Sequence, residues 1–344
     1  MQSTDARGFR LALAGFGVLV CVVVTLGRPA VAAAHGPIDP AASSYQAQVT
    51  QVPEGTDARA VDGDLRLWLR VDPTASVVVL DYRGAPYLRF DRAGVSVNES
   101  SSMYYLNQVP AEIPPIGLGP RTPARWHPVS SGHSYEWHDG RLHALATVAH
   151  GPGSAELGRW TVPLRVGGAP TAVVGSLRFA PAPSLVWFWP IAVVLACVFA
   201  GLRLRRDELD RGLARGLAAG ALGAFVVAAL VRQLHGRPGI GVGSLVVLGF
   251  ELAFAVWATV RLLRGPAGWF QFFAIAAAAI WEGATLVGVL RDGFVLLAGP
   301  PLLGRIAVAT CLALGLGLVP VVIAIAERSS RPRAARAPAG RAAA

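Results

Sequence analysis

The sequence contains no lysine, only three cysteines and only two methionines among its 344 residues. All of its side-chain cations other than histidine are therefore arginine. Cys21, Cys197 and Cys311 lie in long apolar runs, so the polar segment 35–183 has no disulfide and no thiolate ligand. Met103 is the only methionine of that segment, which excludes a Cu(I) site rich in thioethers.

Motifs of several enzyme classes are also missing. The sequence has no nucleophile elbow, no glycine-rich phosphate loop, no H-E-x-x-H zinc motif and no cysteine pair at metal-binding spacing. We therefore predict that the protein is not an enzyme. The net charge of +10 does not indicate nucleic-acid binding, because much of the arginine lies in short loops between apolar runs and in the tail "RSSRPRAARAPAGR".

Long apolar runs indicate a membrane protein. The mean hydropathy is +0.48, and 53% of the residues are apolar against 15% charged, which is unusual for a soluble chain of this length. Apolar spans are expected near 185–202, 213–231, 240–260, 269–290 and 303–326, each long enough to cross about 30 Å of hydrocarbon. The sequence therefore predicts a five-helix transmembrane domain over 184–327, in contact with the lipid bilayer, and a disordered basic cytoplasmic tail over 328–344.

The N-terminus has the pattern of a secretory signal. Arg7 and Arg10 precede an apolar run, and Ala32 and Ala34 fit the small-x-small cleavage rule. We predict a signal peptide over 1–34 and a mature chain that begins at His35, with an uncleaved anchor as the alternative. Arginines concentrate in alternate loops of the membrane domain and in the tail, so the positive-inside rule places the segment after the signal outside and the C-terminus in the cytoplasm.

Segment 35–183 is polar and strand-like. Leu65, Leu67, Leu69 and Val71 alternate along one run, and other short runs are rich in β-branched and aromatic residues. Turn signals separate the runs at Asp62-Gly63, Arg83-Gly84, Asp139-Gly140 and Gly167-Gly168. This pattern predicts an exported antiparallel β-sandwich, immunoglobulin-like or cupredoxin-like, over residues 35–183.

The stretch "EWHDGRLH", residues 136–143, is predicted to form a hairpin around Asp139-Gly140. In such a hairpin Tyr135, Trp137, Leu142 and Ala144 face the core, and Glu136, His138, Arg141 and His143 share the opposite face. His138 and His143 become diagonal neighbours, roughly 7–8 Å apart at the backbone, which two imidazoles that bind one ion can bridge. His133 has the parity of the core face and is a weaker candidate.

A metal site is the functional hypothesis for this face. Six of the seven histidines lie between His35 and His150, and a mature N-terminal His35 can chelate through its amine and its imidazole. Nitrogen ligands of this kind suit Cu(II), with Ni(II) and Zn(II) behind it. The predicted ligands are His35, His138, His143 and Glu136, and His127 and His150 are possible additions. The alternative is that these side chains are only the polar face of a hairpin.

Two carboxylates lie within predicted spans, Glu251 in one and Glu282 in the next. An ionised carboxylate in hydrocarbon costs several kcal/mol, so it is normally protonated, paired or facing a cavity. One interpretation is a polar path for a cation or a proton between the two helices. The other is that each carboxyl is neutral and hydrogen-bonded in a helix interface beside small residues such as Gly249, Gly283 and Thr285.

Several motifs carry a resemblance. "YRGAPYLRF", "MYYLN", "RWHPVSSG", "EWHDGRLH" and "RWTVPLRVGGAP" occur in this order between the signal and the membrane domain. This series resembles a family of uncharacterised actinobacterial membrane proteins with an exported N-terminal domain and a W-H-D-x-R-x-H motif, although Gly140 stands where many members have a further histidine. In architecture and mature N-terminal histidine alone, the chain is similar to copper-resistance proteins of the CopC and CopD types.

We therefore expect a membrane-anchored envelope protein that handles copper or a similar divalent metal at the outer face of the cytoplasmic membrane. The alternative is a structural or assembly subunit of a membrane complex, with no metal site, whose partner is another membrane protein.

Overall fold

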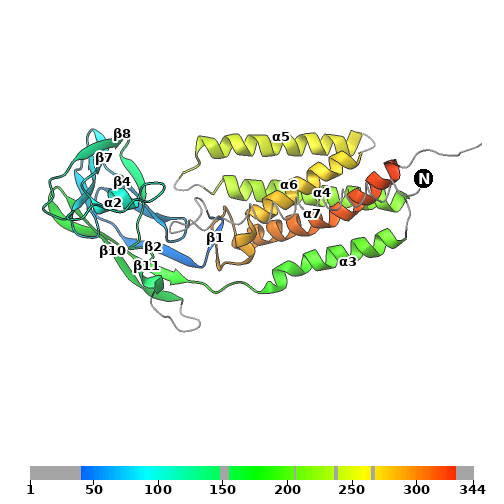
Figure 1. Cartoon of the computed structure of the whole chain (residues 1–344), viewed down its shortest axis with the longest axis horizontal. Helices are drawn as coiled ribbons and strands as arrows, with labels where there is room; N and C mark the ends of the chain where they lie inside the picture. The colour runs from blue at the N-terminus through cyan, green and yellow to red at the C-terminus, as the bar shows by residue number, and fades with distance from the viewer. Residues whose placement is uncertain (1–39, 148–154, 205–206, 236–238, 265–267, 331–344) are drawn as a thin grey trace, which may run out of the picture.

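The structure is a computed structural model that describes residues 40–147, 155–204, 207–235, 239–264 and 268–330. Figure 1 shows a β-domain at one end of the molecule and a bundle of helices at the other. This arrangement confirms the predicted order of an antiparallel β-domain followed by a helical membrane domain. The predicted signal peptide and His35 lie outside the described residues, as does His150.

Two antiparallel sheets build the β-domain. The larger has the strand order β2-β11-β10-β5-β6-β7-β8, and the smaller has the order β3-β4-β9. The strands of the larger sheet are β2 Tyr45–Gln51, β5 Val77–Leu80, β6 Pro86–Asp91, β7 Gly94–Asn98, β8 Trp126–Ser130, β10 Glu156–Val166 and β11 Ala169–Phe179. Those of the smaller are β3 Thr56–Val61, β4 Arg66–Val71 and β9 Ser134–His138. The immunoglobulin-like or cupredoxin-like sandwich class stays a prediction.

Alternation decides which side chains enter the β-domain core. Leu67, Leu69 and Val71 of β4 are buried, as their spacing predicts, while Arg70 is exposed. Both sheets contribute to one cluster of buried residues, which includes Tyr87, Phe90, Trp137, Leu142, Trp160, Leu164 and Leu177. The core is therefore built from apolar side chains without a disulfide.

Turn chemistry is confirmed at Gly167-Gly168. Val166 lies opposite Ala169, so the two glycines form a two-residue turn, and both have positive φ (57° and 86°). This is the conformation that a type I′ hairpin requires and that glycine adopts without strain. A five-residue helix, α2 Ser102–Leu106, was not predicted, because it is too short to show a helical period; Ser101 caps it by accepting a hydrogen bond from the backbone N–H of Met103.

The helical part contains α3 Trp189–Arg203, α4 Asp207–Gln233, α5 Val242–Arg264, α6 Trp269–Thr285 and α7 Pro301–Ser330. They run side by side along the long axis, and α6 returns the chain towards the β-domain (Figure 1). Within the described residues, four segments are long and apolar enough to cross a membrane: Leu185–Arg203, Asp210–Gln233, Val242–Arg264 and Pro301–Arg328.

The fourth predicted span and the predicted tail differ from the structure. The run 269–290 is not one helix: α6 ends at Thr285 after 17 residues, and a 3₁₀ turn, η3 Val287–Leu290, follows it. At about 1.5 Å per residue, α6 is shorter than the roughly 30 Å of a bilayer core. At the C-terminus α7 continues to Ser330, three residues into the segment predicted to be disordered.

Close backbone approach holds the bundle together around α7. A Cβ added at Gly315 would lie 2.9 Å from a side-chain carbon of Ile280 in α6, and one added at Gly317 would lie 2.5 Å from Val194 in α3. Such small residues at contacts allow membrane helices to pack tightly. At the end of the bundle away from the β-domain, the buried carboxylate of Asp210 pairs with Arg328 and joins α4 to α7.

A short two-stranded sheet joins the β-domain to the bundle. β1 Ala42–Ser43 pairs with β12 Phe294–Val295, which lies in the connection between α6 and α7. The Ser44 hydroxyl donates to Asp292 (3.0 Å), and the backbone N–H of Leu296 donates to the carbonyl of Ala41 (2.8 Å). The apolar residues Leu286, Val289, Leu290 and Leu297 of the same connection are buried in the bundle core. Residues 286–300, called here the α6–α7 connection, therefore contact both halves of the molecule.

Candidate functional site

The stretch 136–143 is not a hairpin, which corrects the prediction. Residues 134–138 form β9, which pairs with β4, so that His138 lies opposite Arg66 and Glu136 opposite Trp68. After His138 the chain forms successive turns: the Leu142 N–H donates to the carbonyl of Asp139 (3.1 Å). Trp137 and Leu142 do face the core, but Ala144 is exposed.

The buried carboxylate of Asp139 is the reason for these turns. It accepts hydrogen bonds from the Trp137 indole N–H (2.9 Å) and from the Arg141 backbone N–H (3.1 Å) and Nε (2.8 Å). An Asp side chain that bonds the backbone two residues ahead stabilises a local turn in place of a strand. The Asp-Gly pair therefore reverses the chain into the domain without pairing it back on β9.

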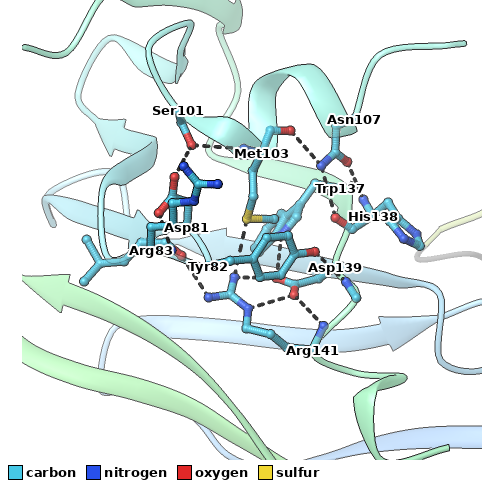
Figure 2. Close-up of polar contacts among 12 residues, drawn as sticks. Asp81, Tyr82, Arg83, Ser101, Met103, Asn107, Trp137, His138, Asp139 and Arg141 are labelled. Atoms are coloured by element: carbon cyan, nitrogen blue, oxygen red, sulfur yellow. Dashed lines mark hydrogen bonds and ion pairs between the residues drawn. The ribbon is translucent and has the colours of Figure 1, made fainter. Parts of the chain in front are cut away.

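Arg141 extends this network into the larger sheet (Figure 2). Its guanidinium pairs with Asp139 (2.7 Å), donates to the carbonyl of Leu80 (2.9 Å) and lies 5.2 Å from the ring centre of Tyr82. The Tyr82 hydroxyl accepts the Gly140 N–H (2.8 Å). Burial, with the nearby negative charge of Asp139, raises the pKa of Tyr82. This half of the motif is thus engaged in holding the two sheets together.

Asn107 satisfies the free edge of β9. Its amide accepts the His138 N–H (2.9 Å) and donates to the His138 carbonyl (3.2 Å), and also to the carbonyl of Met103 (3.0 Å), as Figure 2 shows. At the opposite end of α2, buried Asp81 accepts hydrogen bonds from the hydroxyls of Ser101 (2.9 Å) and Ser102 (3.1 Å). These contacts fix the loop after β7 and helix α2 against the motif.

The described predicted ligands Glu136, His138 and His143 do not have the hairpin geometry that the prediction gave them. Glu136 pairs with Arg66 (2.6 Å), which also binds Asp62. His138 and His143 are not diagonal neighbours of a hairpin, since residues 139–143 are turns. Within the described part of the chain no group of three or more His, Cys, Asp or Glu side chains is arranged to hold a metal.

His143 has the orientation that metal-binding histidines show. Its Nδ1 contacts the buried carboxylate of Asp64, and the ring packs edge-on against Tyr45 with the centroids 5.5 Å apart. The His143 side chain is 44% exposed. A carboxylate on one ring nitrogen fixes the ring and leaves the other nitrogen, Nε2, for a proton or a metal.

The two membrane carboxylates lie near Arg232, which falls just after the predicted span 213–231. Arg232, in the last turn of α4, donates to Glu282 Oε2 (3.0 Å), and its neighbour Gln233 donates to Glu251 Oε2 (3.4 Å). Glu282 is only 1% exposed and lies three residues before the end of α6, in the last turn of that helix.

The small residues predicted to lie in a helix interface beside these carboxylates do not all lie in one. Gly283 allows α7 to approach, because a Cβ there would lie 2.8 Å from Leu312. Nothing lies within 4 Å of a Cβ built at Gly249, and the Thr285 hydroxyl donates to its own helix at Trp281 (2.8 Å). The main partner of Glu282 is thus an arginine, which its place at a span end could have indicated.

Comparisons of the chain with protein-family models, with curated proteins and with solved structures give no match.

Proposed function

We propose that the protein is a membrane-anchored structural or assembly subunit whose β-domain docks onto another envelope protein through the loop between α2 and β8. One observation carries this proposal: Val109, Ile113 and Ile116 of that loop are 89%, 92% and 105% exposed. A group of exposed apolar side chains on one surface segment marks an interaction surface.

The loop is anchored on both sides of its apolar tip. The Glu112 N–H donates to the Tyr105 carbonyl (2.9 Å), and Arg83 donates to the carbonyl of Leu118 (3.0 Å). Residues 113–117 between the anchors read "IPPIG". Prolines restrict the free chain, so less conformational entropy is lost on binding. Proline-rich apolar segments are bound by grooves lined with aromatic side chains, and this is the partner surface we propose.

Photocrosslinking in the host cell tests the docking function. A photoreactive residue at position 113 of the full chain should form one protein adduct, and Ile116→Asp should abolish it because a charge cannot enter an apolar groove. Val52→Asp is the matched control, since Val52 is an exposed valine (38%) of another segment. Adducts with lipid alone, or an adduct that persists in Ile116→Asp, would contradict the proposal.

The proposal includes the topology predicted from the sequence: a cleaved signal, an extracytoplasmic β-domain, five spans and a cytoplasmic C-terminus. Two features support it. Arg203, Arg211, Arg261, Arg264 and Arg328 lie on helix segments at the end of the bundle away from the β-domain. In addition, α6 returns the chain from that end to the start of α7. A reporter fused after Ala344 should be active only in the cytoplasm.

A second candidate function is copper handling, and the contact between Asp64 and His143 favours it. The proposed ligands are His143 Nε2 and, from outside the described residues, a mature N-terminal His35. His143→Ala should weaken Cu(II) binding by the mature chain at least tenfold, a loss of about 1.4 kcal/mol, whereas His133→Ala should leave it unchanged. Equal Cu(II) titrations of His143→Ala and the parent chain would end this candidate and leave the docking function alone.

A further inference from the structure

The membrane end nearest the β-domain holds a group of charges that do not balance. Arg232 of α4 supplies one positive charge, and Glu251 of α5 and Glu282 of α6 supply two negative charges. The adjacent residues Arg232 and Gln233 of α4 bind Glu282 and Glu251 respectively, which places all three charges in one cluster. If every group were ionised, the cluster would carry a net charge of −1, which is costly in an apolar environment.

One oxygen of the cluster has no partner. Glu282 Oε2 accepts from Arg232, but Glu282 Oε1 is buried and makes no hydrogen bond. A buried ionised carboxylate oxygen without a donor is destabilised by several kcal/mol, whereas a protonated one can itself become a donor. The unpartnered oxygen and the missing positive charge therefore both indicate that the cluster holds one further positive charge.

We propose that Glu251 and Glu282 together bind one proton, taken from water at the end of the bundle that faces the β-domain. Arg232 then balances the remaining negative charge. This proton site is a function beyond the docking role, and it does not depend on that role.

Two other ionisable groups, both on α7, do not supply the missing charge. Cys311 of α7 faces Glu282, and a thiol is neutral at ordinary pH. Arg305 of α7 is engaged elsewhere, because its guanidinium donates to the backbone carbonyls of Asp292 (3.2 Å) and Gly293 (2.9 Å). Charge balance within the described cluster is therefore reached by protonation of one carboxyl.

A proton fits this site better than a metal cation. Hard cations take six or more oxygen ligands or retain several waters, and Arg232 lies 3.0 Å from Glu282, where it repels a cation. A proton needs only one oxygen. The Arg232 side chain is 35% exposed at the C-terminal end of α4, so it joins the buried Glu282 to the end of the bundle from which the proton enters.

Infrared spectroscopy of the full chain in lipid nanodiscs at pH 7 tests the charge count. The parent chain should show one protonated carboxyl per molecule. Glu282→Gln and Glu251→Gln should each show none, because either substitution leaves one arginine and one carboxylate. Arg232→Gln should show two, since both carboxyls then lack a counter-charge. Glu112→Gln, an exposed carboxylate of the β-domain, is the matched control and should keep the single signal.

Each result decides the proposal. A parent chain with no protonated carboxyl, or a signal that survives in Glu251→Gln or in Glu282→Gln, would overturn it. A signal that disappears when Na⁺ or K⁺ is added at constant pH would assign the site to a cation and would also overturn it. Because the parent chain and two separate glutamine variants are measured, one misfolded variant leaves the test complete. Docking through Ile113 can fail without any change in these spectra.

Discussion

Asp139→Asn should strongly destabilise the β-domain. Asp139 is fully buried, and the Arg141 guanidinium beside it is only 14% exposed, so the substitution leaves a nearly buried cation without its counter-charge. Removing one partner of such a pair costs about 3–5 kcal/mol. Asparagine also presents an NH₂ group where the carboxylate now accepts the donors of Arg141 and Trp137.

Hydrogen exchange of β4 and β9 amides in the full chain measures this loss locally. Since 1.4 kcal/mol corresponds to a factor of ten, exchange should accelerate from roughly 100-fold to several thousand-fold. Asp91→Asn is the matched control, because the pair of Asp91 with Arg89 has a similar distance (3.0 Å) but its side chains are 33% and 37% exposed. That exposed pair contributes about 0–1 kcal/mol, or less than about fivefold. Equal acceleration in the two variants would refute the structural role of Asp139.

Three further predictions concern pH, the junction and the bundle. Burial raises the pKa of Tyr82 and Tyr87, so the folded state keeps protons that the unfolded state releases near pH 10. The free energy of unfolding should therefore fall as the pH rises above about 10. Between about pH 9 and about pH 10.5, denaturant unfolding should show a smaller fall in this free energy for Tyr82→Phe than for the parent chain. Gly293→Ala should loosen the junction, because its Cβ would lie 2.4 Å from Ala180. The amides of β1 and β12 should then exchange faster with solvent. Gly243→Ala is the control and should leave these exchange rates unchanged, because nothing lies within 4 Å of a Cβ at that position. Arg328→Gln leaves the Asp210 carboxylate buried and unpaired, which should lower the free energy of unfolding by about 3–5 kcal/mol. The melting temperature in detergent should fall accordingly. Substitution of the exposed Arg264 is the control and should leave the melting temperature unchanged.

Local patterns predicted the elements whose cause is itself local. The alternation of Leu67, Leu69 and Val71 identifies a strand and its buried face, because every second side chain of a strand points to the same side. Gly167-Gly168 identifies a hairpin, because few other residues adopt two positive φ angles in succession. The apolar runs likewise identify the helices of the bundle.

The hairpin at Asp139-Gly140 was wrong because the same dipeptide serves two kinds of turn. Its conformation is decided by the partners of the Asp139 carboxylate and by β4, the strand beside which β9 lies. β4 is separated from β9 by more than 60 residues of sequence. No periodicity within residues 134–144 contains that information.

The pairs that define the candidate sites are separated even further. Asp64 and His143 are 79 positions apart, and Arg232 and Glu282 are 50 positions apart. The sequence could indicate that Glu282 needs a partner, since a membrane carboxylate without one is costly. It could not indicate which of the nearby arginines supplies it, because that depends on how α4 and α6 pack.

The junction explains how a β-domain on a short linker can hold the proposed docking loop in a defined position. Residues 180–184 are the only covalent connection between the two described halves, and a single flexible tether would let the domain rotate. The pairing of β1 with β12 adds a second attachment, and the hydrogen bond from the Ala180 N–H to Ser44 (3.0 Å) ties the linker to the same place. Two attachments on different segments remove most rotations of the β-domain. The loop with Ile113 and Ile116 is therefore held in one orientation relative to the bundle, and under the proposed docking function this lowers the entropy lost on binding.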